Sequence, residues 1–212
     1  MNEVATVIVD YGRGNLYGLS CALKQVAAAH EITESPERIV RAERIILPGV
    51  GAYADAMAEL GRRGLIEPLV SAGRGGTPIL GICVGCQLML DGGEEHGETA
   101  GLGLLTGKAR RLPGANNPET HWRIPNVGWH SLTPVRDDTV VSGLTPEMMV
   151  YFSNSYAPAD VAASTIAAVM TFNGVDIPAA LQAGALVGVQ FHPERSGPVG
   201  IEILRRFLTI HR

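Results

Sequence analysis

Buried-strand and amphipathic-helix patterns alternate along the first half of the chain. The run "VATVIVDY" at 4–11 is almost continuously apolar, which is typical of a strand covered on both faces. Residues 15–29 then repeat leucine and valine at helical spacing behind Asn15, which can cap a helix. Further buried strands and helical stretches follow in turn, at 44–49, 53–72, 77–83 and 84–91. This order predicts a parallel sheet with helices on both faces.

The second half has the short, turn-bounded segments that are typical of antiparallel strands. Strand patterns recur between about 104 and 191, among them "VGWHSLTPV", "MVYFSNSYA" and "STIAAVMTF". The segment "AALQAGALVGVQF" predicts a hairpin with Ala-Gly at its turn. A helix over 198–209 closes the chain. The expected fold is a single α/β domain over 1–212, with a mostly parallel central sheet, flanking helices and a smaller antiparallel portion.

Composition argues against several classes of protein. Of 212 residues, 46% are hydrophobic and 18% are charged, which suits a globular core and not a disordered chain. The net charge of −4 gives no electrostatic reason to expect binding to nucleic acid or to an anionic membrane. No apolar stretch nears the ~18 residues that span a bilayer, and the first residues do not resemble a signal peptide. Three cysteines do not make a disulfide framework, so a cytoplasmic location is expected.

The strongest chemical signal is Cys83, which stands between two glycines in "LGICVGCQLML". A sharp strand-to-helix turn forces its central residue into a strained conformation, and Gly81 and Gly85 leave room for the neighbouring elements to approach. The helix that begins after Cys83 offers unpaired N–H groups and the positive end of its dipole. This setting predicts a cysteine nucleophile.

A thiol nucleophile needs a base, and only one of the six histidines lies in a setting that suggests catalysis. In "GVQFHPERSG", an apolar strand pattern leads directly into His192-Pro193-Glu194. Pro193 biases His192 towards an extended conformation, in which positions 192 and 194 face the same way. We therefore expect Glu194 to orient the imidazole, as the third member of a catalytic triad does.

Three other interpretations stay open on these residues alone. Cys83 and Cys86 could form a redox pair, although the glycine pattern is not that of a thioredoxin-like motif. A cysteine hydrolase of the α/β-hydrolase type would share the turn, but it needs an acid before the histidine in chain order. The glycine-rich turn "GRGNLYG" at 12–18 could belong to a dinucleotide-binding module, although its spacing is not the usual fingerprint. No metal-ligand spacing is recognisable.

The motifs together resemble those of a known family. Gly-x-Cys-x-Gly-x-Gln at 81–87 with His-Pro-Glu at 192–194 resembles the class I (triad) glutamine amidotransferases. Five further segments are similar to the glutaminase subunits of imidazole glycerol phosphate synthases and follow the order of that group: "DYGRGNL", "LPGVGAY", "GWH", "YFSNSY" and "GVQFHPERSG". They cover nearly the whole chain, so the resemblance concerns all of it.

The resemblance implies a role for each motif. Cys83, His192 and Glu194 correspond to nucleophile, base and orienting acid. The other correspondences are an oxyanion hole from the backbone of Val50, Gly51 and Val84, and glutamine-binding positions at Gly49 and Gln87. The implied reaction is hydrolysis of glutamine to glutamate and ammonia through a glutamyl thioester, without cofactor or metal.

The resemblance also implies a partner, a TIM-barrel cyclase that forms a heterodimer with the glutaminase and receives the ammonia. Six positions are expected at that interface: Asn15, Asn126, Trp129, Tyr151, Asn154 and Arg195. Asn126 and Asn154 stand where members of the family usually have histidine, and His130 stands where they have asparagine. These departures leave a second hypothesis, a paralogue that feeds another synthase such as a sugar amidotransferase of surface-polysaccharide pathways. The loop over 111–126 is expected to be a lid or a docking surface.

Overall fold

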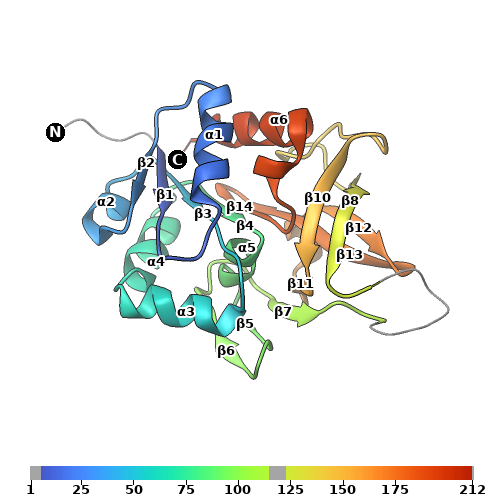
Figure 1. Ribbon diagram of the computed structural model, residues 1–212, viewed down its shortest axis with the longest axis horizontal. Helices are drawn as coiled ribbons and strands as arrows, with labels where there is room; N and C mark the ends of the chain where they lie inside the picture. Colours follow the sequence, from blue (N-terminus) through green and yellow to red (C-terminus); the bar gives the residue numbers. More distant parts are fainter. Residues whose placement is uncertain (1–5, 115–122, 212) are drawn as a thin grey trace.

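A central eight-stranded sheet organises the chain, whose computed structural model describes residues 6–114 and 123–211 (Figure 1). Its first five strands are parallel neighbours, in the order β2 (Glu31–Thr33), β1 (Thr6–Val9), β3 (Arg44–Leu47), β4 (Ile79–Ile82) and β14 (Leu186–Val189). Three antiparallel strands complete it, namely β13 (Val175–Ala183), β12 (Ile166–Phe172) and β9 (Thr133–Pro134). The expected α/β class with a mostly parallel sheet is confirmed.

Helices cover this sheet on both sides. In Figure 1, α1 and α6 lie together above the sheet, and α3, α4 and α5 lie below it. Their apolar faces supply much of the core, as the helical spacing predicts. The helices are α1 (Leu16–Gln25), α2 (Pro36–Val40), α3 (Tyr53–Arg62), α4 (Ile66–Arg74), α5 (Val84–Leu88) and α6 (Gly197–Leu208). No helix of the described residues is both long and apolar enough to cross a membrane.

The first helix ends earlier than the sequence pattern predicts. Ala27 takes a left-handed conformation with a φ of 53°. The Ala28 N–H then donates to the Leu23 carbonyl at 3.1 Å, and the Ala27 N–H donates to the Lys24 carbonyl at 3.0 Å. This pair of bonds is a Schellman cap, which usually needs glycine, so the sequence carries no visible stop signal here. The three-residue β2 and the five-residue α2 were also missed because each is too short to show a period.

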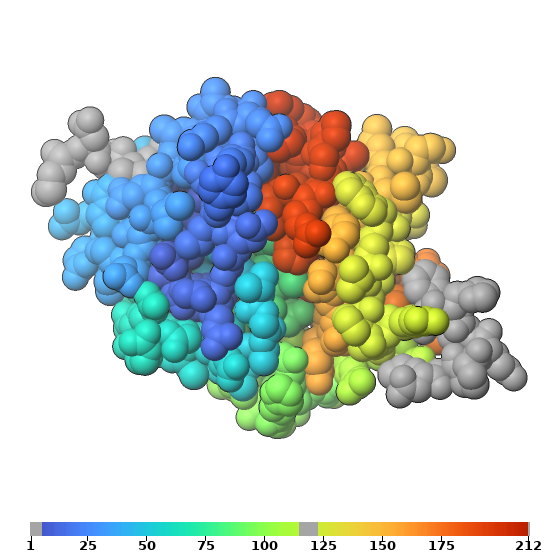
Figure 2. All heavy atoms as spheres, viewed as in Figure 1, coloured from blue at the N-terminus to red at the C-terminus, as the bar shows by residue number. Residues whose placement is uncertain are grey.

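The antiparallel half, which lies mostly on the right-hand side of Figure 2, forms two smaller sheets beside the main one. One pairs β8 (Asn126–Ser131) with β10 (Met149–Asn154). The other has four strands in the order β11 (Tyr156–Ala159), β7 (Lys108–Arg111), β5 (Gly92–Gly93) and β6 (Thr99–Ala100). The predicted hairpin is β13–β14, with Gly184 at a φ of 56° in its turn. This hairpin extends the central sheet, so the antiparallel portion is not simply appended to it.

The strand order brings three chain segments to one edge of the sheet. β3, β4 and β14 are parallel neighbours, with Leu47 opposite Gly81 and Ile82 opposite Val189. Because parallel strands end at the same edge, the segments that follow Leu47, Ile82 and Val189 meet there. These segments carry the "PGVG", Cys83 and His192 motifs.

Substitution of Gly85 tests how tightly these segments pack. A Cβ at Gly85 would lie 1.8 Å from the Leu47 carbonyl oxygen, whereas the nearest atom to a Cβ at Gly61 in α3 is 3.6 Å away. Gly85→Ala should therefore lower the free energy of unfolding by about 3 kcal/mol or more, or prevent folding. The control Gly61→Ala should raise it by ~0.5–1 kcal/mol, because alanine favours the helix. Urea unfolding measures both, and equal stabilities would contradict the packing argument.

Candidate active site

Cys83 lies on a strained turn between β4 and α5. Its φ of 55° and ψ of −113° fall in a region that residues with a Cβ rarely adopt. The turn is held on both sides, because the Cys83 N–H donates to the Val189 carbonyl at 2.8 Å and the Cys83 carbonyl accepts from Gln87 N at 3.2 Å. The predicted nucleophile turn is therefore present, with its strain sustained by β14 and by the first turn of α5.

Glycines allow this turn because the backbones around it almost touch. A Cβ at Gly81 would lie 2.7 Å from the Gly85 carbonyl oxygen. A Cβ at Gly49 would lie 2.5 Å from the Gly85 nitrogen and 2.8 Å from the Tyr11 hydroxyl. The structure thus places Gly49 behind the turn as a packing position. Its neighbours Val50 and Gly51 line the cavity beside Cys83, and the role of Gly49 in glutamine binding stays a prediction.

His192 and Glu194 form the expected pair by a different local geometry. His192 Nδ1 lies 3.1 Å from Glu194 Oε1, and both side chains are buried. The sequence argument placed them on one face of an extended segment. Instead, Pro193 begins a 3₁₀ turn, η2 (Pro193–Arg195), which folds Glu194 back alongside the imidazole. The contact agrees with the prediction, whereas the extended conformation beyond His192 was wrong.

The charges of the three groups are coupled. Burial lowers the pKa of His192, but hydrogen bonds with Cys83 and Glu194 and the negative charges on both raise the pKa to about 10. A cationic imidazole between the sulfur and the carboxylate is therefore the favoured state at neutral pH. This is the arrangement that a thiolate nucleophile requires.

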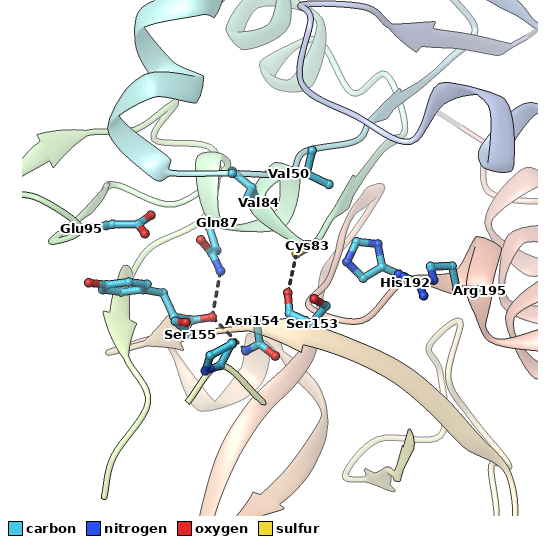
Figure 3. Close-up of a pocket in the computed structure, with 13 residues that line it drawn as sticks. Val50, Cys83, Val84, Gln87, Glu95, Ser153, Asn154, Ser155, His192 and Arg195 are labelled. Atoms are coloured by element: carbon cyan, nitrogen blue, oxygen red, sulfur yellow. Dashed lines mark hydrogen bonds between the residues drawn. The ribbon is translucent and has the colours of Figure 1, made fainter. Parts of the chain in front are cut away.

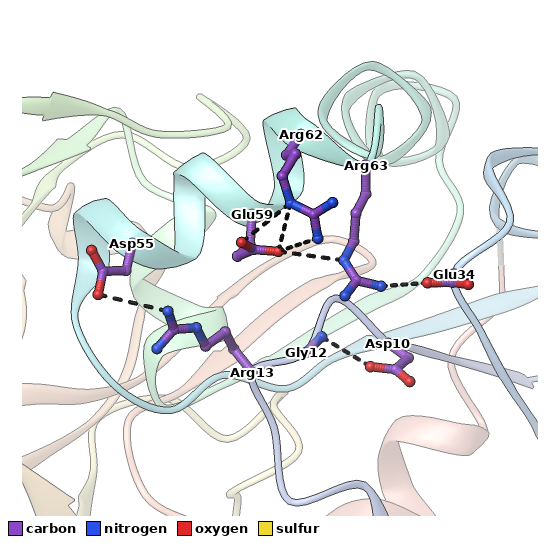
Figure 4. Close-up of polar contacts among 8 residues, drawn as sticks. All are labelled: Asp10, Gly12, Arg13, Glu34, Asp55, Glu59, Arg62 and Arg63. Atoms are coloured by element: carbon purple, nitrogen blue, oxygen red, sulfur yellow. Dashed lines mark hydrogen bonds and ion pairs between the residues drawn. The ribbon is translucent and has the colours of Figure 1, made fainter.

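Asn15 supports this pair from α1. Its Nδ2 donates to Glu194 Oε1 at 3.3 Å, while its Oδ1 accepts from Gly18 N at 3.2 Å and caps the helix. In the loop before Asn15, Arg13 pairs with Asp55 of α3 at 3.7 Å (Figure 4). Arg63, at the end of α3, pairs with Glu34, just after β2. The cap is confirmed, and Asn15 is exposed, while its place at a partner interface stays a prediction.

A cavity of about 270 Å³ opens beside Cys83 (Figure 3). His192 and Cys83 lie at one end of it, and Glu95 lies at the other. Val50, Gly51 and Val84 also line the cavity, as the oxyanion-hole prediction requires, and so does Gln87. The further lining residues are Pro125, Ser153, Asn154, Ser155, Tyr156 and Arg195. Among the described residues, no group of His, Cys, Asp or Glu is arranged to hold a metal ion.

The comparison with known proteins decides the family. The sequence model of "Glutamine amidotransferase class-I" matches residues 7–210.

The chain belongs to the class-I glutamine amidotransferase family.

Its relatives include imidazole glycerol phosphate synthase subunits HisH from two bacteria. The protein of Geobacillus thermodenitrificans (strain NG80-2) is 40% identical over 203 residues, covering 96% of this chain and 94% of that protein. That of Listeria monocytogenes serotype 4b (strain F2365) is 39% identical over 206 residues, covering 97% and 96%.

Solved structures agree on the amidotransferase fold. A crystal structure described as a glutamine amidotransferase superposes with a TM-score of 0.73 at 17% identity, covering 96% of this chain and 97% of that one. PurLQS from Thermotoga maritima gives a TM-score of 0.72 at 19% identity, covering 98% of both chains. At these identities the likeness concerns the fold alone.

Two of the expected interface residues face inward in this amidotransferase. Asn126 and Asn154 are 4% and 6% exposed, and Asn126 Nδ2 donates to Asn154 Oδ1 at 3.3 Å. Asn154 Nδ2 also donates to the Tyr156 carbonyl at 2.9 Å. Because side chains alternate across a strand, Asn126 on β8 and Asn154 on β10 point into the protein. The expectation that both face a partner is wrong for the chain as folded here, and Asn154 lines the cavity instead.

Three of the other positions expected at the interface, Trp129, Tyr151 and Arg195, form a connected group. Trp129 is 49% exposed and meets the Tyr151 ring edge-on, with 5.9 Å between ring centroids. The Arg195 guanidinium lies 4.0 Å from the centre of the Tyr151 ring. His130, the third departure, is half-buried against Phe152, and burial lowers its pKa. Trp129, Tyr151 and Arg195 thus connect the outer face of the β8–β10 sheet to the cavity.

Sequence reasoning missed several residues of the site. Gln190 is buried and its Nε2 lies 3.6 Å from Cys83 Sγ. Ser196 donates to the His192 carbonyl at 2.6 Å and accepts from Tyr151 N at 3.0 Å, which links η2 to β10. Glu95 reaches the cavity from the loop after β5. The one visible signal was a glutamine inside the apolar run "GVQF".

The redox alternative conflicts with the burial of Cys86. This thiol is completely buried, and burial raises its pKa. A Cβ at Gly188 would lie 2.6 Å from Cys86 Sγ, so the sulfur fills the space that the glycine leaves. Cys86 therefore packs α5 against β14 and is not accessible to a redox partner.

The charge state of His192 can be tested directly. We expect the imidazole to stay protonated through neutral pH and to titrate near pH 10 in NMR spectra of side-chain-labelled protein. Cys83→Ala should lower the pKa of His192, because a hydrogen bond and a negative charge disappear. Because the native pKa exceeds the unfolded value of about 6.5, the stabilisation is complete below that pH and is lost as the pH rises towards 10. Titration near pH 6.5 in the native protein would contradict the coupling.

Proposed function

We propose that Cys83, His192 and Glu194 hydrolyse the side-chain amide of glutamine. The observation that carries the proposal is that Cys83 and His192 line one end of the same cavity, with Glu194 Oε1 at 3.1 Å from His192 Nδ1 behind them. Membership of the amidotransferase family supports glutamine as the substrate.

The reaction begins with attack of the Cys83 sulfur on the amide carbon of glutamine. Val50, Gly51 and Val84 line the cavity, and their backbone N–H groups would stabilise the negative charge on the carbonyl oxygen. His192 then donates its proton to the departing nitrogen, so ammonia leaves and a glutamyl thioester forms. Water, deprotonated by the neutral imidazole, hydrolyses the thioester to glutamate.

The far end of the cavity suits the amino-acid part of glutamine. Glu95 is partly buried there and is held by a 2.7 Å hydrogen bond from Tyr53 N. Its carboxylate would pair with the α-ammonium group of the substrate. Gln87 lines the same cavity and would shape the space around the side chain.

We propose further that the ammonia passes to a cyclase subunit of imidazole glycerol phosphate synthase, in histidine biosynthesis. Full-length relatives at 40% and 39% identity are subunits of that synthase. The exposed Trp129 beside Tyr151 and Arg195 offers the TIM-barrel cyclase a docking surface, because aromatic and arginine side chains are enriched at protein interfaces. Free thiols at Cys21, Cys83 and Cys86 fit a cytoplasmic heterodimer.

The buried asparagine pair weakens the alternative of another synthase as acceptor. That hypothesis rested on Asn126, Asn154 and His130 altering the docking surface. The two asparagines bond to one another on the buried face of the β8–β10 sheet, so neither side chain contributes to the outer face. The histidine-pathway cyclase is therefore the better-supported partner.

Two linked assays test the function and the partner. Glutamine hydrolysis should rise about tenfold or more when the cyclase and its nucleotide ligand are both added. Cys83→Ala should abolish synthesis from glutamine yet leave synthesis from added ammonium unchanged, because only the ammonia source is removed.

The two assays can contradict different parts of the proposal. If glutamine hydrolysis does not rise in protein whose Cys83 reacts with a glutamine analogue, the cyclase is excluded as partner and the glutaminase function is retained. Loss of ammonium-dependent synthesis in a folded, cyclase-bound variant would contradict the proposal that this chain only supplies ammonia to the cyclase.

The role of the surface group can be tested by truncating Trp129. Trp129→Ala should weaken binding of the cyclase about 30-fold, because a buried interface tryptophan contributes roughly 2 kcal/mol. Val175→Ala is a matched control, since Val175 is 45% exposed but lies on the β12–β13 hairpin. Isothermal titration calorimetry measures both affinities. Equal affinities for the two variants would remove Trp129 from the interface.

A further inference from the structure

Gln190, which directly follows β14, contacts the sulfur of the candidate nucleophile. It is 1% exposed, although the rest of that segment is apolar. Its backbone N–H donates to the Ala179 carbonyl at 2.9 Å, which anchors the residue to β13. Its side-chain Nε2 lies 3.6 Å from Cys83 Sγ, within the range of hydrogen bonds to sulfur, across 107 positions of sequence.

The hydrogen-bond network determines which end of the Gln190 amide faces the sulfur. Gln87 Nε2 donates both to the Tyr156 carbonyl at 2.9 Å and to Gln190 Oε1 at 2.8 Å. A carbonyl oxygen can only accept, so the NH₂ group of Gln87 must point towards Tyr156 and Gln190. The Gln190 atom that meets this NH₂ group is therefore its oxygen, and its own NH₂ group is directed at Cys83.

The surroundings of the sulfur give this donor a chemical effect. On another side, the Ser153 carbonyl lies 4.0 Å from Cys83 Sγ and can accept a hydrogen bond from the neutral thiol only. An N–H donor does the opposite, because its hydrogen bond strengthens when sulfur becomes negative. His192 accepts the thiol proton, and Gln190 then faces the resulting charge in a buried, low-dielectric setting.

We propose that Gln190 is a further catalytic residue, whose side-chain amide donates a hydrogen bond to the Cys83 sulfur and stabilises it as the thiolate. Gln87 is then a positioning residue, because its two donated bonds prevent the Gln190 amide from turning over. The proposal rests on the proposed glutaminase function for its role in turnover, but the contact with the thiolate does not depend on the substrate.

The pH profile of Cys83 alkylation tests the contact without glutamine. Gln190→Met keeps the length of the side chain and removes the donor. The rate of modification by iodoacetamide, followed by mass spectrometry of the Cys83 peptide, should fall about tenfold near neutral pH. Its midpoint should move up by about one pH unit, as loss of a hydrogen bond to a charged group predicts. The kcat of glutamine hydrolysis should fall by a similar factor, with little change in KM.

Gln182→Met is the matched control for this variant. Gln182 lies on β13, where its Oε1 accepts from Val140 N at 2.9 Å, and the described contacts do not join it to Cys83. Its alkylation profile should equal that of the unmodified protein. Gln87→Met should give a smaller upward shift than Gln190→Met, because the donor remains but is no longer oriented.

The outcomes separate this proposal from the glutaminase function. An unchanged alkylation midpoint in folded Gln190→Met would overturn the proposal even if glutamine is hydrolysed. A shifted midpoint in a protein that does not hydrolyse glutamine would retain the contact and remove the proposed function. If Gln190→Met does not fold, NMR of the glutamine side-chain amides in the unmodified protein tests the contact instead. The chemical shifts of the Gln190 amide should then change with pH around the midpoint of Cys83 alkylation, and this change should be absent in Cys83→Ala. Gln190 chemical shifts that do not depend on pH would overturn the proposal.

Discussion

The close approach of Gly85 to the Leu47 carbonyl is the constraint on which the rest of the site depends. There is no room for a Cβ at Gly85, so the backbone of α5 can lie directly on the end of β3. This contact holds Cys83 at its unfavourable φ of 55° and presents the "PGVG" segment to the same cavity. A strained residue persists only where its surroundings determine its conformation. Here β3, β14 and α5 together fix the conformation of Cys83. Small residues thus give the site its rigidity.

Electrostatic contacts then extend from the sulfur in several directions. His192 is held between Cys83 and Glu194, and Glu194 is held in turn by the cap residue of α1. On the outer side, the Arg195 guanidinium lies over the Tyr151 ring, which contacts Trp129 on the exposed face of the β8–β10 sheet. The residue that follows Glu194 in the chain therefore belongs to both the cavity and the candidate interface.

Asn126 and Asn154, on the inward face of the β8–β10 sheet, show that a departure from a family pattern does not always alter the surface of a protein. Asn126 and Asn154 differ from the usual histidines, and their motifs lie beside residues of the expected interface. The pleat of the strands nevertheless turns both side chains inward, where they satisfy one another and the Tyr156 carbonyl. An asparagine pair of this kind is uncharged at every accessible pH, unlike a pair of histidines. The change therefore concerns the wall of the cavity and not the outer face.

The sequence by itself determined the features whose causes are local. The glycines around Cys83, the His-Pro-Glu order and the alternation of buried strands with helices can be read directly, because turn sterics and helical periodicity depend on residues close in sequence. Even there, the 3₁₀ turn at Pro193 and the helix cap at Ala27 could not be predicted, since neither has a distinctive residue pattern. Only the tertiary structure decided that β14 pairs with β4, and hence that Gln190 meets Cys83 and Asn15 meets Glu194. These contacts join residues far apart in the chain, and they arise from the order of the strands, which no local pattern encodes.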